Sequence, residues 1–198
     1  MHKHTEKELI KGCKQYNRQI QEEVYNRYSS VLRAVCSRYA KDFSETEDIL
    51  QEGFVKIFTH IKTFSYQGEG SFVFWMKKVV VNAAITFYNK HSKKRKELSI
   101  EDSPVDVDKN DNLSATQNEY EDGMYNSSKL TQEQIIKVLQ SVPEDFRVVF
   151  NLYVMEGYSH KEIADMLEVK TETSRTRLLR AKNIIRRELL LIDKNLAK

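Results

Sequence analysis

The sequence predicts an all-α protein made of two helical domains joined by a flexible linker. Glycine and proline are scarce, with 6 and 2 among 198 residues, so few strong breakers interrupt the chain. Apolar residues recur at three- and four-residue steps rather than in alternation, which is the helical period. Serine or threonine, followed three positions later by glutamate or glutamine, precedes several of these periodic runs, as at helix N-termini.

The first periodic segment covers residues 5–91. Its apolar spacing is typical of helices. Ser44 and Glu47 form a candidate capping box, which predicts a helix from about Glu45 to about Ile61. A loop containing two glycines follows at residues 63–70, and the pattern then predicts a helix over about 71–90. We therefore expect a first helical domain over residues 1–91.

Residues 92–130 differ from the rest of the chain in composition. They open on the basic run Lys93-Lys94-Arg95-Lys96 and continue with acidic residues, serine and asparagine, and few apolar side chains. Such a segment buries too little apolar surface to offset its chain entropy. We expect a flexible acidic linker over 92–130, a chain of about 40 residues whose reach grows as roughly 5–6 Å × √n.

Helical periodicity returns at Thr131, which can form a capping box with Gln134, and predicts a second domain over residues 131–198. A second helix should open at Pro143 and end near Gly157. A third capping box, Ser159 with Glu162, predicts a short helix over 160–167. The turn 168–170 separates it from a longer helix over about 171–191. This arrangement is that of a helix-turn-helix.

The longer helix is strongly basic. Glu172 and Glu188 oppose a larger set of cations, Arg175, Arg177, Arg180, Lys182, Arg186 and Arg187. A helix of this kind fits the major groove, where its N-terminal residues reach base edges and its basic residues hold phosphates. A solvated basic face on a structural hairpin would also explain the charge. The capped short helix and the three-residue turn favour binding to double-stranded DNA.

Bulk properties limit the remaining classes. The net charge is only +3, so the chain as a whole is no polycation. Cys13 and Cys36 are far apart, lack CxxC spacing and are expected to be buried thiols of a reduced protein. The residues after Met1 form no apolar signal segment, and no apolar stretch is long enough to span a bilayer. We expect a soluble cytoplasmic protein without membrane insertion.

The segment from Leu139 to Leu189 resembles region 4 of the extracytoplasmic-function (ECF) sigma factors of the sigma-70 superfamily, most closely in 159–164 and 176–182. Residues 47–56 resemble region 2.2. Phe72–Met76 and Val79–Asn82 resemble regions 2.3 and 2.4. Two motif blocks in the right order cover nearly all of the chain except the linker. Glu168 departs from the family, which often has glycine in the turn.

This resemblance implies a promoter-specificity subunit that binds core RNA polymerase, recognises the -35 and -10 promoter elements and helps to melt DNA. Its partners would be core RNA polymerase (the largest-subunit clamp and the flap), promoter DNA and an anti-sigma factor. We expect no catalysis, no cofactor and no metal. The helix that contains Asp48, Gln51 and Glu52 would dock on the clamp, since these residues share one helix face.

The family also implies the DNA contacts. For the -10 element we expect the loop residues Phe64, Ser65 and Tyr66 to hold an unstacked base, Asn82 to bond a base edge, and Lys77 and Lys78 to hold the backbone. Core packing is the alternative for Phe72 and Trp75. For the -35 element we expect contacts from region 4, made by Ser159, His160, Lys161, Thr171, Thr173, Ser174, Arg175, Arg177 and Arg180.

Other functions remain open at this point. A stand-alone helix-turn-helix regulator would use residues 1–91 for sensing or dimerisation, but the blocks at 48–54 and 72–82 disfavour it. A metal nuclease would need Asp48, Glu52 and His60 around one ion, yet Glu52 and His60 lie two helical turns apart. The acidic linker would either occupy a basic polymerase channel or serve as a plain tether.

Overall fold

The protein, described here from a computed structural model, is helical in all its regular elements within the described residues 4–101 and 131–196. This confirms the all-α class. None of the described helices is long and apolar enough to cross a membrane. In chain order the elements are α1 (Glu6–Lys14), α2 (Arg18–Cys36), α3 (Phe43–His60), the 3-10 turn η1 (Ile61–Thr63), α4 (Ser71–Glu101), α5 (Gln132–Ser141), α6 (Glu144–Phe150), the π-helical turn η3 (Asn151–Met155), α7 (His160–Leu167) and α8 (Thr171–Leu196).

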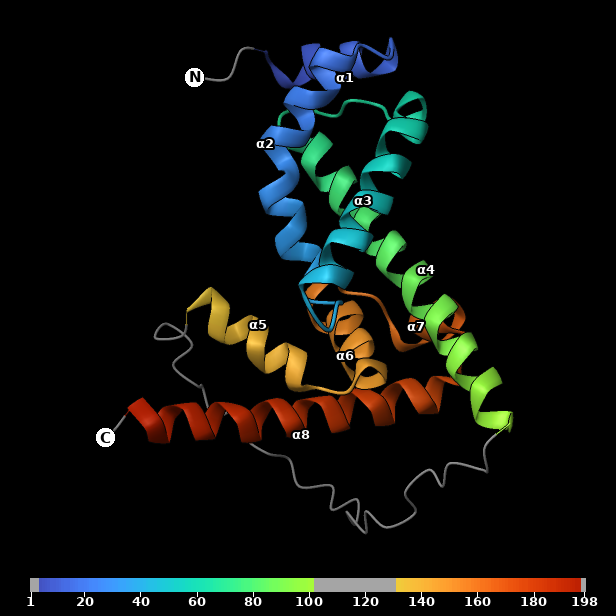
Figure 1. The fold of residues 1–198 in the computed structure, drawn as a ribbon, viewed down its shortest axis with the longest axis vertical. Helices are drawn as coiled ribbons and strands as arrows, with labels where there is room; N and C mark the ends of the chain where they lie inside the picture. Colours follow the sequence, from blue (N-terminus) through green and yellow to red (C-terminus); the bar gives the residue numbers. More distant parts are fainter. Residues whose placement is uncertain (1–3, 102–130, 197–198) are drawn as a thin grey trace.

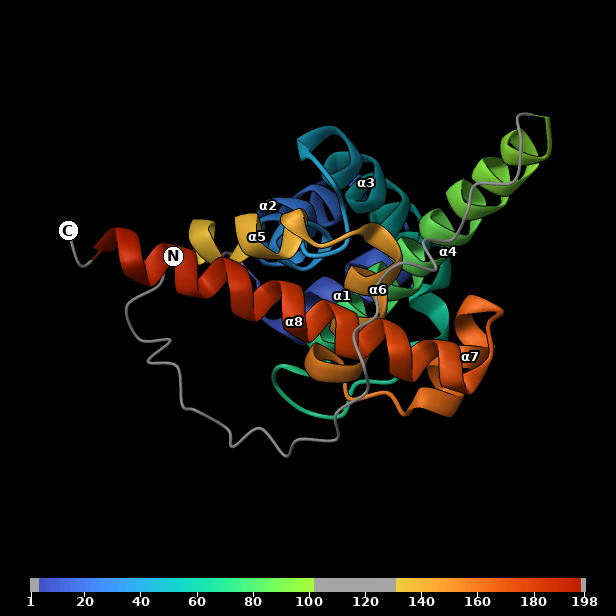
Figure 2. The ribbon, with the colours of Figure 1, turned by 90° about the horizontal axis from the view of Figure 1, so that it is seen from below.

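Helices α1 to α4 form a bundle at one end of the molecule (Figure 1). Helix α8 lies across the other end with α5 beside it, and α6 lies between α8 and the bundle. The C-terminal part of α4 projects away from the body (Figure 2). One apolar core runs through both groups of helices, since Phe72 and Ile85 of α4 belong to the same buried cluster as Val149 and Ile163. The two groups therefore pack together.

Side-chain caps start most of these helices. The expected capping boxes of Thr131 with Gln134 and of Ser159 with Glu162 both form. The box expected at Ser44 was wrong. Helix α3 begins at Phe43 because the Asp42 carboxylate accepts the backbone N–H of Glu45. Glu47, the expected partner of Ser44, instead forms an ion pair with Arg33 of α2.

Two helices are longer than the sequence pattern suggested. Helix α4 continues to Glu101 rather than ending near Lys90, because no glycine or proline interrupts residues 71–103. It therefore takes up the start of the segment expected to be linker. The flexible acidic linker expected over the remainder, 102–130, lies outside the described residues. Helix α8 ends at Leu196 rather than near Leu191.

Both cysteines are free and buried, as expected. Burial raises the pKa of the Cys13 thiol to about 11 and that of the Cys36 thiol to about 12. The thiolate is the reactive form of cysteine, so both thiols are chemically inert in the folded protein near neutral pH. The packing of α1 and α2 thus accounts for both cysteines.

Helices α3 and α4 approach closely at Gly53. A Cβ atom at this position would lie 2.6 Å from Cγ1 of Val80, well inside van der Waals contact. Val80 is fully buried, and a β-branched side chain in a helix has essentially one χ1 rotamer, so it cannot turn aside. The glycine therefore sets the distance between the two helices that carry most of the candidate site.

We expect Gly53→Ala to lower the free energy of unfolding by about 1–2 kcal/mol, because overpacking costs about 1–3 kcal/mol and better helix propensity returns about 0.5–1 kcal/mol. Urea unfolding measures this. Val80→Ala provides the control. In a double-mutant cycle the two substitutions should cost less together than the sum of each alone. A stabilised Gly53→Ala protein would show that the helices separate freely.

Candidate functional site

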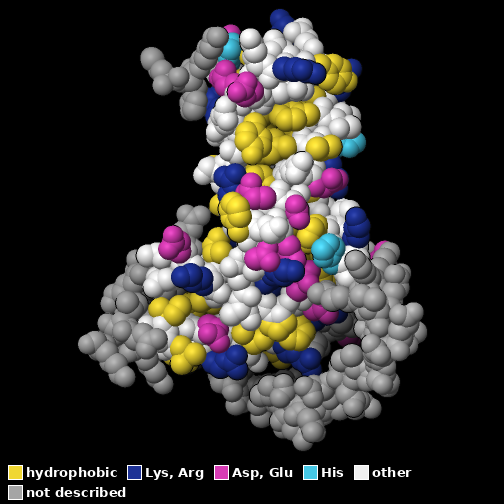
Figure 3. All heavy atoms as spheres, in the orientation of Figure 1, with side chains coloured by type: hydrophobic (Ala, Val, Ile, Leu, Met, Phe, Trp, Pro, Cys, Tyr) yellow, Lys and Arg dark blue, Asp and Glu magenta, His cyan; other side chains and the backbone are white. Residues whose placement is uncertain are grey.

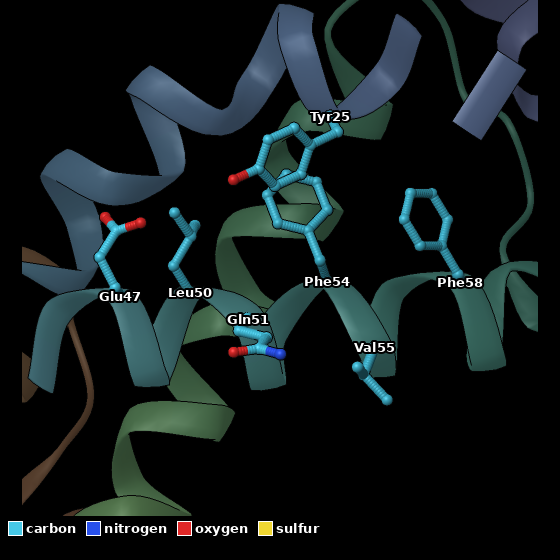
Figure 4. A pocket seen from close by; sticks show the side chains of 7 residues that line it. All are labelled: Tyr25, Glu47, Leu50, Gln51, Phe54, Val55 and Phe58. Carbon is cyan, nitrogen blue, oxygen red and sulfur yellow. The ribbon is translucent and has the colours of Figure 1, made fainter. Parts of the chain in front are cut away.

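One candidate surface lies on α3. Asp48, Gln51 and Glu52 are all exposed on it, as the sequence predicted, and Glu52 forms an ion pair with Lys56 at 3.5 Å. A groove runs beside Asp48 and Glu52, and Gln51 forms part of its lining. The groove is lined by Tyr25, Glu47, Leu50, Gln51, Phe54, Val55 and Phe58 (Figure 4).

This groove is largely apolar, which the sequence reasoning missed. Val55 is 56% exposed, and Tyr25 packs on Phe54 with their ring centroids 4.7 Å apart. Apolar side chains lie exposed over α2 and α3 on this face (Figure 3). An apolar groove with charged neighbours is the composition of a protein–protein interface, whose core is depleted in charge and whose rim is polar. Val55 was the available signal, since it interrupts the polar side of α3.

The loop between η1 and α4 differs from expectation in one residue. Phe64 was expected to help hold an unstacked base, but it is only 7% exposed and its ring packs on Phe72 and Trp75 at 5.5 and 5.0 Å. The loop curls inward at its start, so this ring completes the core. Ser65 is exposed and Tyr66 is half-buried, with the Lys7 ammonium 5.1 Å from its ring centroid. Ser65 and Tyr66 thus remain available to a ligand.

Helix α4 presents a stripe of exposed side chains one turn apart, namely Phe74, Lys78 and Asn82. Phe74 is 60% exposed, and the Lys78 ammonium lies 4.8 Å from its ring centroid. Lys77 is half-buried beside this stripe. Sequence reasoning assigned Lys78 and Asn82 to DNA but missed Phe74. The spacing of four residues between Phe74 and Lys78 was the available signal that both side chains lie on one helix face.

The helix-turn-helix forms from α7 and α8. The turn residue Glu168 has φ +54°, a left-handed conformation that glycine adopts without steric cost, which accounts for the glycine common in the family. Ser174 was expected to contact DNA, but it is fully buried. Its hydroxyl lies 3.0 Å from Nδ1 of His160 and so links the two helices. Burial lowers the pKa of His160, which makes its imidazole a poor cationic phosphate ligand at neutral pH.

The exposed face of α8 carries Arg175, Thr176 and Leu179. Arg175 is extended into solvent near Glu172, at 3.6 Å. The other predicted cations, Lys161 and Arg180, are exposed, while Thr171 and Thr173 are half-buried and the cap residue Ser159 is exposed. Thr176 and Leu179 were not predicted as contacts. Leu179 suits the methyl group of thymine, which apolar side chains recognise in the major groove.

Arg177 does not belong to this exposed face. Its guanidinium forms an ion pair with Asp145 of α6 at 3.0 Å and lies 3.3 Å from the hydroxyl of Tyr88 on α4. That hydroxyl donates to the same carboxylate at 2.7 Å. Burial raises the pKa of Tyr88 to about 12, so the hydroxyl keeps its proton. Arg177 is therefore committed to contacts within the protein in this arrangement.

Comparison with known proteins connects these surfaces. Residues 24–94 match the model of Sigma-70 region 2, and residues 132–185 match that of Sigma-70, region 4. The chain is 23% identical to the ECF RNA polymerase sigma-E factor of Haemophilus influenzae over 197 residues, 93% of this chain and 95% of that protein. It is 24% identical to the protein of that name from Escherichia coli K12, over 80% of this chain and 81% of that protein.

The chain belongs to the ECF sigma factors of the sigma-70 superfamily. Among solved structures it is similar to the sigma factor RpoE of Bartonella quintana in complex with the anti-sigma factor NepR, with 20% identity, a TM-score of 0.46, and coverage of 87% of this chain and 97% of that one. Region 2 of this sigma factor includes α3 and most of α4, and region 4 includes α7 and the first part of α8. Helix α1 precedes the matched residues.

Regions 2 and 4 of the sigma factor contact each other beside the end of α2 as well. Asn151 donates to the carbonyl of Arg38 at 2.6 Å, and the Arg38 guanidinium forms an ion pair with Glu156 at 2.9 Å. Arg147 donates to the carbonyl of Tyr39 at 3.1 Å. We call these contacts, together with the Tyr88–Asp145–Arg177 group, the joint.

The hydrogen bonding of buried polar atoms at the joint is incomplete. Three buried side-chain atoms lack a hydrogen-bond partner among the described residues, namely Oη of Tyr39, Nε of Arg147 and Oδ1 of Asn151, and all three lie at the joint. Arg147 is 2% exposed, and burial lowers its pKa. An unsatisfied buried polar atom costs about 1–3 kcal/mol. Opening the joint would hydrate these atoms, which favours an interface that can separate.

The described residues hold no group of three or more His, Cys, Asp and Glu side chains placed to bind one metal ion.

Proposed function

We propose that this sigma factor binds core RNA polymerase and directs transcription from promoters that carry a -35 and a -10 element of matching sequence. The observation that carries the proposal is that one chain matches region 2 and region 4 and presents a separate exposed surface on α3, α4 and α8. The protein acts as an initiation factor rather than as an enzyme. The family also implies an anti-sigma factor as a partner.

Core polymerase binds at the groove on α3 in this proposal. The apolar lining, with Val55 and Phe58, supplies the buried centre of the interface. Asp48, Gln51 and Glu52 form its polar rim, where charged residues act mainly on the rate of association. Basic side chains on the polymerase clamp would complement this rim.

The -10 element binds across the loop and the stripe on α4. Ser65 and Tyr66 hold an unstacked base, and Phe74 stacks on a neighbouring base, since base–aromatic stacking is worth about 1–3 kcal/mol per base. Asn82 bonds a base edge, while Lys77 and Lys78 neutralise the backbone. The contacts of the loop and those of α4 both come from region 2, so a single domain melts the DNA and holds the opened strand.

The -35 element binds to the exposed face of α8. We expect Arg175→Ala to weaken binding to one upstream sequence by about tenfold, which is about 1.4 kcal/mol, and to weaken binding to other sequences far less, because a bidentate base contact is worth about 1–3 kcal/mol. Transcription from a set of promoters substituted at single upstream positions measures this. Lys182→Ala is the matched control for a phosphate contact. Uniform weakening by Arg175→Ala would show that it also contacts only the backbone.

The two DNA surfaces lie too close together in the packed arrangement to reach both elements. Asn82 is six residues from Tyr88, about 9 Å along the helix, and Tyr88 contacts Arg177. The elements are roughly 25 base pairs apart by their names, or about 85 Å at 3.4 Å per base pair. The domains must therefore separate at the joint, which also releases Arg177.

Reconstitution with core RNA polymerase tests the proposal. The mixture should transcribe a subset of genomic promoters that core enzyme alone does not use, and the free protein should bind the same duplexes weakly. A protein that binds a duplex tightly by itself, and adds nothing to core polymerase, would be a stand-alone regulator. That result would overturn the proposal.

A further inference from the structure

The loop expected to hold an unstacked base is fastened by α1, an element that precedes the residues matched to region 2. The Glu6 carboxylate accepts the backbone N–H of Gly70 through Oε2 and that of Phe72 through Oε1, both at 2.9 Å. At the other end of the loop, the Lys14 ammonium donates to the carbonyl of Phe64 at 2.7 Å. One helix thus holds both ends of the loop.

The loop also has fixed points of its own, namely the buried ring of Phe64 at its start and the hydrogen bonds of Ser71 with Gly68 and Gln67 at its end. Gly68 and Gly70 have φ +121° and +85°, conformations that leave a free chain many alternatives. Within the loop, Ser71 donates to the carbonyl of Gly68 at 2.6 Å. Glu6 adds a negative charge at the N-terminal end of α4, which the helix dipole favours. The contacts to α1 act together with these fixed points to select one loop conformation among several.

Helix α1 is suited to this role because it is fixed independently of the loop. Gly12 lies so close to α2 that a Cβ atom there would be 2.7 Å from Cγ1 of Ile20. At the start of α1, His4 contacts Glu23 at 2.7 Å, and Arg27 donates to the carbonyl of His4 at 3.0 Å. Because α1 is fixed on α2, its contacts with the loop also fix the position of the loop relative to α2.

A hollow lies between α1, α2 and the loop. Lys7, Arg27, Tyr28 and Tyr66 line it together with His4, Thr5 and the carboxylates of Glu6 and Glu69, and the Glu6 carboxylate is bound to the backbone of the loop. Aromatic rings beside cationic side chains are the chemistry that receives a base together with its phosphate. The half-buried ring of Tyr66 stands at this hollow and contacts the Lys7 ammonium. The conformation of the loop thus decides where Tyr66 stands.

We infer that Glu6 and Lys14 are positioning residues for recognition of the -10 element, acting through the loop to place Tyr66 against an unpaired base of the non-template strand. This inference rests on the proposed function. It assigns to α1 a part in reading the promoter, separate from the binding of core polymerase at the groove on α3. Neither Glu6 nor Lys14 contacts DNA in this scheme.

Glu6→Gln tests the inference, because glutamine keeps one acceptor but turns an N–H toward a backbone N–H. With core polymerase, the variant should form open complexes about tenfold less well, as read by permanganate reactivity of -10 thymines, and should discriminate less between -10 sequences. Its affinity for core polymerase should stay within twofold of wild type. Glu22→Gln is the matched control, since Glu22 is exposed on α2 and changes charge equally.

A second pair of variants separates positioning from a loss of folding. Lys14→Met should reproduce the defect of Glu6→Gln, while Lys11→Met, at an exposed position on the same helix, should not. On a Tyr66→Ala background, Glu6→Gln should add nothing, because both changes remove the same contact. Additive losses, or a Glu6→Gln protein that matches Glu22→Gln, would overturn the inference. If the wild-type protein itself fails to direct transcription, the proposed function fails instead.

Discussion

Replacing Val55 with aspartate should lower the affinity of the sigma factor for core RNA polymerase by about 100-fold and leave its fold intact. Val55 is 56% exposed in the free protein, so a carboxylate is solvated there. In the complex it would be buried against an apolar surface without a partner, and an uncompensated buried charge costs about 3–5 kcal/mol when burial is complete. A loss of about 2.7 kcal/mol corresponds to a 100-fold change.

Fluorescence anisotropy of labelled protein titrated with core enzyme measures this affinity. Val31→Asp is the matched control, because Val31 is 44% exposed on α2 and does not line the groove. The control should bind as wild type does, and both variants should unfold at similar urea concentrations. Equal affinities for the two variants would place the polymerase on a different surface of region 2.

The polar residues beside Val55 should behave differently. Asp48 and Glu52 are exposed at the rim, where charges steer encounter and are screened by salt. Substitution of Asp48 or Glu52 should change mainly the association rate, while substitution of Val55 should change mainly the dissociation rate. The sequence predicted this polar face because acidic residues at one-turn spacing are a local signal. It did not identify the groove, since Leu50 and Phe58 have the same pattern as core residues.

The all-α class and most helix starts followed from the sequence, because capping boxes and helical periodicity are local signals. Ser159 with Glu162 is such a case, and α7 begins where that box predicts. Helix ends were harder to place. The absence of a breaker over residues 71–103 was visible in the sequence, but the change to a charged composition after residue 91 outweighed it, and α4 extends to Glu101. Neither a glycine nor a proline marks the π-helical turn at 151–155.

Individual site residues were less predictable, because burial depends on partners distant in sequence. Phe64 reads as a loop aromatic, yet Phe72 and Trp75 of the next helix give it a place in the core. Ser174 lies in a polar run on α8, yet it faces His160 of α7. Phe74 lies in an apolar run of the sequence, so its exposure could not be predicted from its neighbours. In each case the deciding contact joins two elements whose relative orientation the sequence pattern does not reveal.

The joint between the regions was outside the reach of sequence reasoning for the same reason. Arg177 matches the family pattern for a helix that reads DNA, and nothing near it in the chain indicates a partner. Its partners, Asp145 and Tyr88, are 32 and 89 residues away. If closure at the joint competes with DNA, the affinity of the free protein for a duplex is reduced by the fraction of molecules that are open.

Weakening the joint should therefore strengthen DNA binding. We expect the double variant Arg38→Ala with Tyr88→Phe to bind a duplex that carries a -35 element about 30-fold more tightly than wild type, in the absence of polymerase. The hydrogen bond from Tyr88 to the Asp145 carboxylate is worth about 1.5 kcal/mol, and the Arg38–Glu156 pair, with side chains about 20% exposed, adds about 0.5 kcal/mol. Together, about 2 kcal/mol shifts the balance between closed and open molecules 30-fold, and duplex affinity follows this shift in full while the closed form predominates.

The sign of this effect separates it from simple electrostatics. Arg38→Ala removes a positive charge, which by itself weakens binding to phosphate, and Tyr88→Phe changes no charge. Arg18→Ala, at an exposed position on α2, removes the same charge away from the joint and should bind no better than wild type. Anisotropy with a labelled duplex at fixed salt measures all three proteins. Unchanged or weaker binding by the double variant would mean that the joint does not compete with DNA, and that Arg177 is held by Asp145 in the bound state too.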